Sequence, residues 1–144
     1  MEKSTFGFEA FFGRKRSERE KTMRTILIVD DQSGIRELLC EVFRKEGYDV
    51  YDTDNGEDAL QLFDDKLPQL VLLDMKMPGM SGLDILKTIK IKQPNTSVVM
   101  MTAYAELDLI EQAFHLGALT CFKKPFDIHE IRTFVNETLH DLTI

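Results

Sequence analysis

Residues 70–79 read Leu-Val-Leu-Leu-Asp-Met-Lys-Met-Pro-Gly. Four consecutive aliphatic residues are typical of a short strand that is buried on both faces, and Pro78-Gly79 predicts a turn soon after it. Asp74 then stands where the strand ends, at an edge of the sheet. Two interpretations are open at this point: the carboxylate takes part in chemistry, or it caps the turn that follows.

From Arg24 onwards, short aliphatic runs alternate five times with segments of helical periodicity. The expected strands are 25–29, 48–51, 70–74, 97–101 and 118–122, and the expected helices are 33–46, 56–65, 82–92, 106–116 and 128–139. Ser33 and Asp127 are the expected N-caps of the first and last helices. Strands that alternate with helices at this spacing predict an α/β fold, a doubly wound five-stranded parallel sheet with five helices on its two faces.

The composition indicates one globular domain. The chain has 144 residues, of which 43% are hydrophobic and 30% charged, and these values are ordinary for a single domain. Its apolar runs are too short to cross a bilayer and no cleavable leader opens it, so we expect a cytoplasmic protein with no membrane span. Cys40 and Cys121 lack metal-site spacing and are expected as reduced, buried thiols, with a disulfide as the weaker interpretation.

Residues 1–22 differ from the rest of the chain. They hold six Lys/Arg and four Asp/Glu, a net charge of +2, whereas residues 23–144 hold twelve and twenty-one, a net charge of −9. We expect residues 23–144 to form the domain. Three interpretations of the extension stay open: a tag or misassigned start, a tail without fixed structure, or an amphipathic helix that docks its phenylalanines on a partner. The acidic domain argues against nucleic acid as the main partner, because phosphate binding needs a concentrated basic face.

Polar residues follow four of the five expected strands. Asp30 and Asp31 follow the first strand, Asp74 ends the third, Thr102 follows the fourth and Lys124 follows the fifth. The carboxyl ends of parallel strands meet at one edge of the sheet, so we expect these side chains to lie together. Each alone has an ordinary explanation as a cap, a strand end or a surface lysine. Their joint placement is less easily accidental.

Three acids at one edge repel each other, and a hard divalent cation with oxygen ligands relieves that repulsion. Mg²⁺ is the natural choice, with Mn²⁺ as a substitute. A carboxylate beside the ion can attack phosphorus and form an aspartyl-phosphate. Thr102 can donate a hydrogen bond to a phosphoryl oxygen and Lys124 can neutralise another, as phosphoryl transfer requires.

Four motifs resemble the receiver domain of two-component response regulators: Ile28-Val29-Asp30-Asp31, Leu72-Leu73-Asp74-Met75-Lys76-Met77-Pro78-Gly79, Met101-Thr102-Ala103 and Lys124-Pro125-Phe126. The resemblance covers about residues 24–140 and implies a flavodoxin-like sheet with strand order 2-1-3-4-5. It implies that Asp74 is the phosphoacceptor, that Asp30 and Asp31 are the magnesium acids, and that the main-chain carbonyl of Lys76 is a further metal ligand.

The resemblance also assigns secondary roles. It implies that Thr102 is the switch hydroxyl, that Lys124 is the phosphate lysine, and that the Lys124-Pro125 peptide is cis. Lys76 and Tyr104 stand where receivers tune the lifetime of the phosphoryl group. Cys121 departs from the pattern, because many receivers carry a rotating aromatic residue there, and this puts aromatic switching of an output face in doubt.

No output domain is expected after the last helix, so the chain resembles a stand-alone receiver and is most similar to that of a sporulation phosphorelay. The implied partners are a sensor histidine kinase, a histidine phosphotransferase helix bundle and a phosphatase. We expect a docking surface around Asp74 made of Ser33, Gly34, Ile35, Leu38, Pro125 and Phe126. The alternative for Ile35 and Leu38 is that both belong to the ordinary core.

Three other functions stay open. A chemotaxis-type single-domain receiver would act by phosphorylation-dependent protein binding. A magnesium-dependent phosphatase would need a second acid two residues after the nucleophile, and this chain has Lys76 there. The chain is therefore expected to be a phosphotransferase only as a phosphoryl carrier, without turnover of external substrates. A degenerate interaction module is the third alternative, although every site residue is present.

Overall fold

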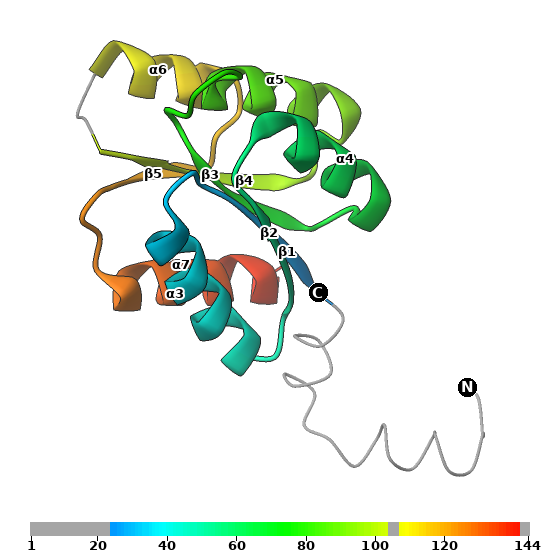
Figure 1. Cartoon of the computed structure of the whole chain (residues 1–144), viewed down its shortest axis with the longest axis vertical. Helices are drawn as coiled ribbons and strands as arrows, with labels where there is room; N and C mark the ends of the chain where they lie inside the picture. Colours follow the sequence, from blue (N-terminus) through cyan, green and yellow to red (C-terminus); the bar gives the residue numbers. More distant parts are fainter. Residues whose placement is uncertain (1–23, 104–106, 142–144) are drawn as a thin grey trace.

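The computed structural model describes residues 24–103 and 107–141 (Figure 1). The strands are β1 (Thr25–Val29), β2 (Asp49–Thr53), β3 (Leu70–Asp74), β4 (Ser97–Thr102) and β5 (Thr120–Lys123). The helices in this part of the chain are α3 (Ser33–Lys45), α4 (Gly56–Lys66), α5 (Gly82–Lys92), α6 (Leu107–His115) and α7 (Ile128–Asp141). Expectations for residues 1–22 and for Tyr104 lie outside the described residues.

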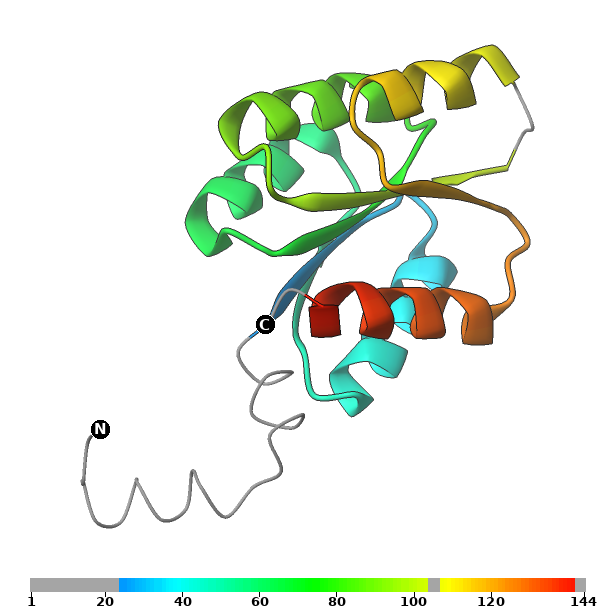
Figure 2. The ribbon, with the colours of Figure 1, turned by 180° about the vertical axis from the view of Figure 1, so that it is seen from behind.

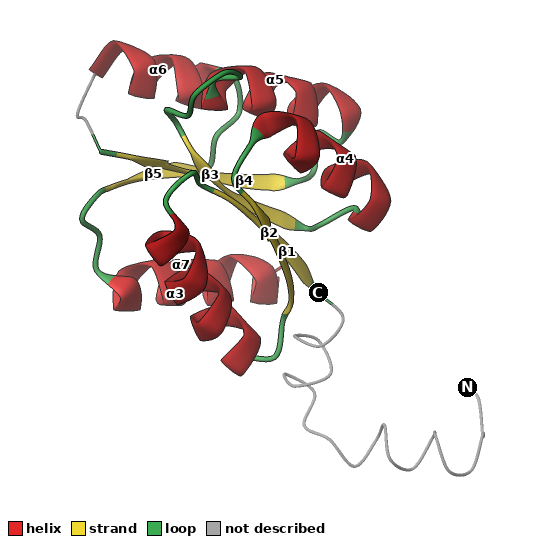
Figure 3. Ribbon diagram, in the orientation of Figure 1, coloured by secondary structure: helices red, strands yellow, loops and turns green. Residues whose placement is uncertain are grey.

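All five strands form one parallel sheet in the order β2-β1-β3-β4-β5. Helices α4, α5 and α6 cover one face of the sheet, and α3 and α7 cover the other (Figures 1 and 3). The reverse view shows the same two helical layers with the sheet between them (Figure 2). This arrangement confirms the doubly wound α/β fold that the sequence predicted and the strand order that the resemblance implied.

The central strand β3 explains why the fold has two cores. Successive side chains of a strand point to opposite faces, so Val71 and Leu73 pack in the core under α4, α5 and α6. Leu70 and Leu72 pack in the core under α3 and α7. Every residue of β3 is buried, which is the environment that four consecutive aliphatic residues predicted.

Two local expectations were wrong in detail. Gln32, not Ser33, is the N-cap of α3, and its side chain makes no capping hydrogen bond. Strand β5 begins two residues later than expected. The Ala118 N–H still donates to the Ala113 carbonyl of α6 and Gly117 has a φ of 105°, so this segment completes the helix before the strand starts.

Both cysteines are free thiols, which excludes a disulfide between them. Cys40 is buried, and burial, followed by the negative charge of Asp52, raises the pKa of its thiol to about 11. Cys121 is only partly buried, contrary to the expectation, although burial also raises its pKa. Within residues 24–103 and 107–141, no helix combines the length and the apolarity needed to span a membrane.

Candidate functional site

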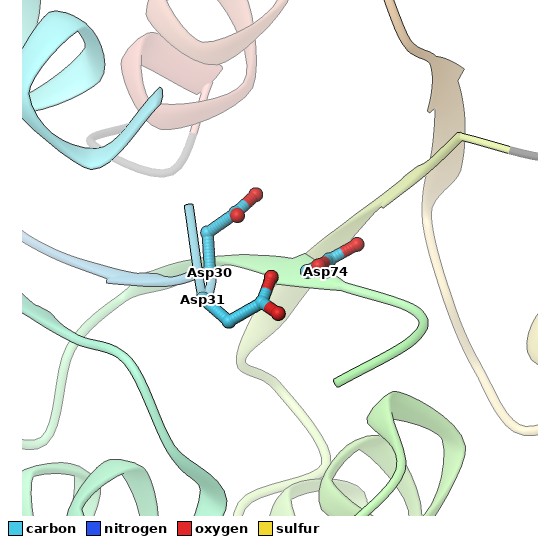
Figure 4. Close-up of side chains that lie close together, drawn as sticks. All are labelled: Asp30, Asp31 and Asp74. Atoms are coloured by element: carbon cyan, nitrogen blue, oxygen red, sulfur yellow. The ribbon is translucent and has the colours of Figure 1, made fainter. Parts of the chain in front are cut away.

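Three carboxylates gather where β1 and β3 end (Figure 4). Asp30 and Asp31 follow β1, and Asp74 is the last residue of β3. The two strands are adjacent, with Val29 opposite Leu73, so their ends coincide. One oxygen from each acid lies within 4.8 Å of the others. Asp30 is 0% exposed and Asp74 4% exposed, whereas Asp31 is exposed.

The surroundings of Asp74 disfavour the ionised form of its carboxyl. Burial, and next to it repulsion by the Asp30 carboxylate, raises the pKa of the Asp74 carboxyl, and the Lys124 ammonium opposes this change; the resulting pKa is about 6. Buried carboxylates that repel one another are the oxygen donors that a hard divalent cation neutralises. The three acids therefore fit Mg²⁺ in ligand type, charge and separation.

Lys124, one residue past β5, reaches back across the sheet edge to the acids. Its Nζ donates to Asp30 Oδ2 at 2.7 Å and to Gln32 Oε1 at 3.0 Å, and it lies 3.5 Å from Asp74 Oδ1. The Lys124-Pro125 peptide is cis, as the resemblance implied. The structure thus brings Lys124 into the cluster, although 94 residues separate it from Asp30.

Thr102 ends β4, beside β3, and is 2% exposed. Its carbonyl accepts a hydrogen bond from the Lys124 N–H at 2.7 Å, and the neighbouring Met101 carbonyl accepts one from the Met75 N–H at 2.8 Å. Two carbonyls at the end of β4 therefore fix the backbone next to Asp74 and the backbone of Lys124. Lys76 is exposed and lies two residues beyond Asp74.

Gly82 lets the loop after Asp74 fold back against the strand end. Its N–H donates to the Met75 carbonyl at 2.9 Å. A Cβ atom at this position would lie 2.3 Å from the Asp74 carbonyl oxygen and 2.7 Å from Met75 Cα. Sequence reasoning missed Gly82, and it also missed Gln32, because neither residue type by itself signals a long-range contact.

The expected docking residues divide into two groups. Ser33, Gly34 and Pro125 are exposed, and Leu38 is 43% exposed. Ile35 and Phe126 are partly buried and pack against the core shared with α3 and α7. The Leu38 side chain is thus accessible for contact with a partner, whereas the Ile35 side chain packs partly against the core.

Comparison with known proteins agrees with this geometry. The family described as "Response regulator receiver domain" matches residues 26–136. Sporulation initiation phosphotransferase F of Bacillus subtilis is 57% identical over 114 residues, which are 79% of this chain and 92% of that protein. Regulatory protein AtoC of Escherichia coli is 40% identical over 114 residues, but the match covers only 25% of its length.

Solved structures show the same architecture. A CheY-like receiver domain protein from Methanospirillum hungatei superposes with a TM-score of 0.79 at 27% identity, over 82% of this chain and 94% of that one. The receiver domain of a LuxO repressor protein from Vibrio parahaemolyticus gives 0.76 at 32% identity, over 82% and 91%. The predicted likeness is confirmed, and this chain belongs to the response regulator receiver domain family.

Proposed function

We propose that Asp74 accepts a phosphoryl group from the phosphohistidine of a sensor kinase and passes it to a histidine of a helix-bundle phosphotransferase, in a sporulation-type relay. The observation that carries the proposal is the cluster of three acids with Lys124 Nζ 3.5 Å from Asp74. The 57% identity to sporulation initiation phosphotransferase F, over 92% of that protein, supports the relay. Lys76, where a hydrolase would need a second acid, supports a carrier over a turnover enzyme.

In the forward step, a carboxylate oxygen of Asp74 attacks phosphorus while the bond from phosphorus to the donor imidazole nitrogen breaks. The imidazole nitrogen takes up a proton as it leaves. The pKa of about 6 keeps most Asp74 carboxyls ionised at neutral pH, so the nucleophile is available. Lys124 and Thr102 are the groups proposed to stabilise charge on the transferred phosphoryl oxygens. Onward transfer reverses the two bond changes on an acceptor histidine.

Asp30, Asp31, Asp74 and the main-chain carbonyl of Lys76 are the proposed ligands of Mg²⁺, with Mn²⁺ as a substitute. When bound, the ion would disperse negative charge on the phosphoryl oxygens. We assign phosphoryl-lifetime tuning to Lys76 and Tyr104, the positions two residues after Asp74 and Thr102.

The proposed partners are the kinase, the helix-bundle phosphotransferase and a phosphatase that resets the carrier, all in the cytoplasm. Their docking surface comprises Ser33, Gly34, Ile35, Leu38, Pro125 and Phe126. We further propose that residues 23–144 act as the receiver and residues 1–22 as a separate extension.

Acetyl phosphate tests the chemistry without a partner. Incubation of the full chain with acetyl phosphate and Mg²⁺ should give one phosphate adduct by intact mass, and Asp74→Ala should abolish it. An adduct that persists in Asp74→Ala, or none in the wild type, would contradict the proposal. Continuous release of phosphate from diverse esters would indicate a phosphatase instead.

Radiolabel transfer tests the relay. Label from a sporulation-type histidine kinase should reach Asp74 and then appear on a helix-bundle acceptor when that protein is added. A phosphorylated chain that binds a target protein but never passes its label onward would favour a chemotaxis-type receiver.

A further inference from the structure

Arg36 ties the loop that carries two of the acids to the neighbouring strand. It lies near the start of α3 with its side chain 20% exposed. Its Nη1 donates to the main-chain carbonyl of Asp30 at 2.9 Å, and its Nε donates to Asp52 Oδ2 at 3.1 Å. Asp52 belongs to β2 and is paired in register with Ile28 of β1. The guanidinium therefore bridges the end of β1 and the edge strand.

The carbonyl that Arg36 holds belongs to the peptide unit between Asp30 and Asp31. A peptide unit is planar and includes the backbone nitrogen and Cα of the next residue. A hydrogen bond to the Asp30 carbonyl oxygen therefore restrains the backbone from which the Asp31 side chain extends. Asp30 has further restraints, because its N–H donates to the Thr53 carbonyl at 3.1 Å and its Oδ1 accepts from the Gln32 N–H at 2.9 Å. Its orientation is thus fixed from several sides.

Asp31 lacks such restraints. Its side chain is exposed and makes no hydrogen bond or ion pair with any residue in the described part of the chain. Two buried carboxylates lie within 4.8 Å of it, and like charges at that distance favour a rotation of the exposed one into solvent. The position of Asp31 in the cluster therefore depends on its backbone.

We infer that Arg36 is a positioning residue of the metal site, which holds the Asp30–Asp31 peptide so that Asp31 faces the other two acids. This inference rests on the metal site of the proposed function. Arg36 acts through the main chain and contacts neither the reacting carboxylate nor the phosphoryl group.

Charge and geometry predict opposite effects of removing Arg36. A positive charge near a cation site repels the cation, so on charge alone its loss should tighten metal binding. If Arg36 positions Asp31, its loss should weaken metal binding instead. Lysine keeps the charge but lacks the planar fork that reaches two acceptors at once, so Arg36→Lys separates the two effects.

Manganese binding by the full chain tests the inference. Free Mn²⁺ is counted by electron paramagnetic resonance across a titration of the wild type, Arg36→Lys and Arg36→Gln. Both variants should raise the Kd about tenfold, as is common for groups that orient metal ligands. An unchanged Kd in Arg36→Lys, or a tighter Kd in Arg36→Gln, overturns the inference.

Arg44 provides the matched control. It also lies on α3, and its Nη2 donates to the Val50 carbonyl of β2 at 2.9 Å, but its contact lies away from the acids. Arg44→Lys, which keeps the charge, and Arg44→Gln, which removes it, should both leave the Kd within about twofold of the wild type, since neither change affects a contact of Asp30. An equal loss in the Arg44 variants would assign the effect to general loosening of α3 and overturn the inference.

Asp52→Asn and Asp31→Asn complete the test. If Asp52 acts by anchoring Arg36, Asp52→Asn should raise the Kd more in the wild-type background than in Arg36→Gln; equal effects in both backgrounds contradict the anchor. Asp31→Asn should remove the Mn²⁺ site. If the wild type binds Mn²⁺ no better than Asp31→Asn, the proposed metal site itself is refuted. If the wild type binds Mn²⁺ but the Arg36 variants have the same Kd, only the inference about Arg36 is refuted.

Discussion

At the scale of a single residue, Gly82 illustrates how the site depends on a missing side chain. A methyl group there would meet the Asp74 carbonyl oxygen at 2.3 Å and the Met75 backbone at 2.7 Å. Neither neighbour is a flexible side chain, so Gly82→Ala must move the backbone that carries the phosphoacceptor. We expect it to lower the free energy of unfolding by about 1–3 kcal/mol, measured by urea denaturation.

Gly34 is the control for this prediction. It lies in α3 with no atom within 4 Å of an added Cβ. Alanine costs less conformational entropy than glycine in a helix, so Gly34→Ala should stabilise the protein by roughly 0.5–1 kcal/mol. If Gly82→Ala were as stable as the wild type, the close approach at Asp74 would not be a constraint.

At the scale of an element, α3 combines core packing with the proposed docking surface. Leu38 is 43% exposed, whereas Leu39 and Phe43 on the same helix are buried. Leu38→Ala should therefore leave stability and acetyl phosphate labelling of Asp74 nearly unchanged. It should slow transfer to a helix-bundle acceptor by roughly tenfold, the effect of losing about 1.4 kcal/mol of apolar contact, measured by rapid-quench radiolabel transfer.

Ile91 provides the comparison on another helix. It is 72% exposed, and it lies near the end of α5, whereas Leu38 lies on the helix that begins beside the acids. Ile91→Ala should leave the transfer rate unchanged. Equal rates for Leu38→Ala and the wild type would remove α3 from the docking surface. Ile35 is a less clean probe because it also packs against the core.

At the scale of the whole molecule, the buried carboxylate of Asp74 reduces stability when it is ionised. The pKa of Asp74 is about 6 in the folded protein against an ordinary value of 3.8. The folded state therefore holds the proton more tightly, and stability falls as pH rises from about 4 to above 6. Asp74→Asn removes this cost, so without metal it should be more stable than the wild type above pH 6, by up to roughly 3 kcal/mol.

Urea denaturation in the presence of a chelator measures this difference across pH. The advantage of Asp74→Asn should shrink as pH falls through 6 and should be smallest below 4, where the wild-type carboxyl is protonated in both the folded and the unfolded chain. A difference that does not change with pH would mean that the substitution acts through packing rather than charge.

The sequence by itself determined the order of strands and helices and the edge at which the acids meet. The alternation of short strand segments with helical segments predicted a parallel sheet, and Asp30, Asp31 and Asp74 stand at the carboxyl ends of two of its strands. The hydrogen-bond partners were decided by the tertiary structure. Lys124 reaches Asp30 across 94 residues, Arg36 reaches Asp52 across 16, and Gly82 packs against a strand end. Such contacts depend on how elements pack, and local periodicity carries no information about that.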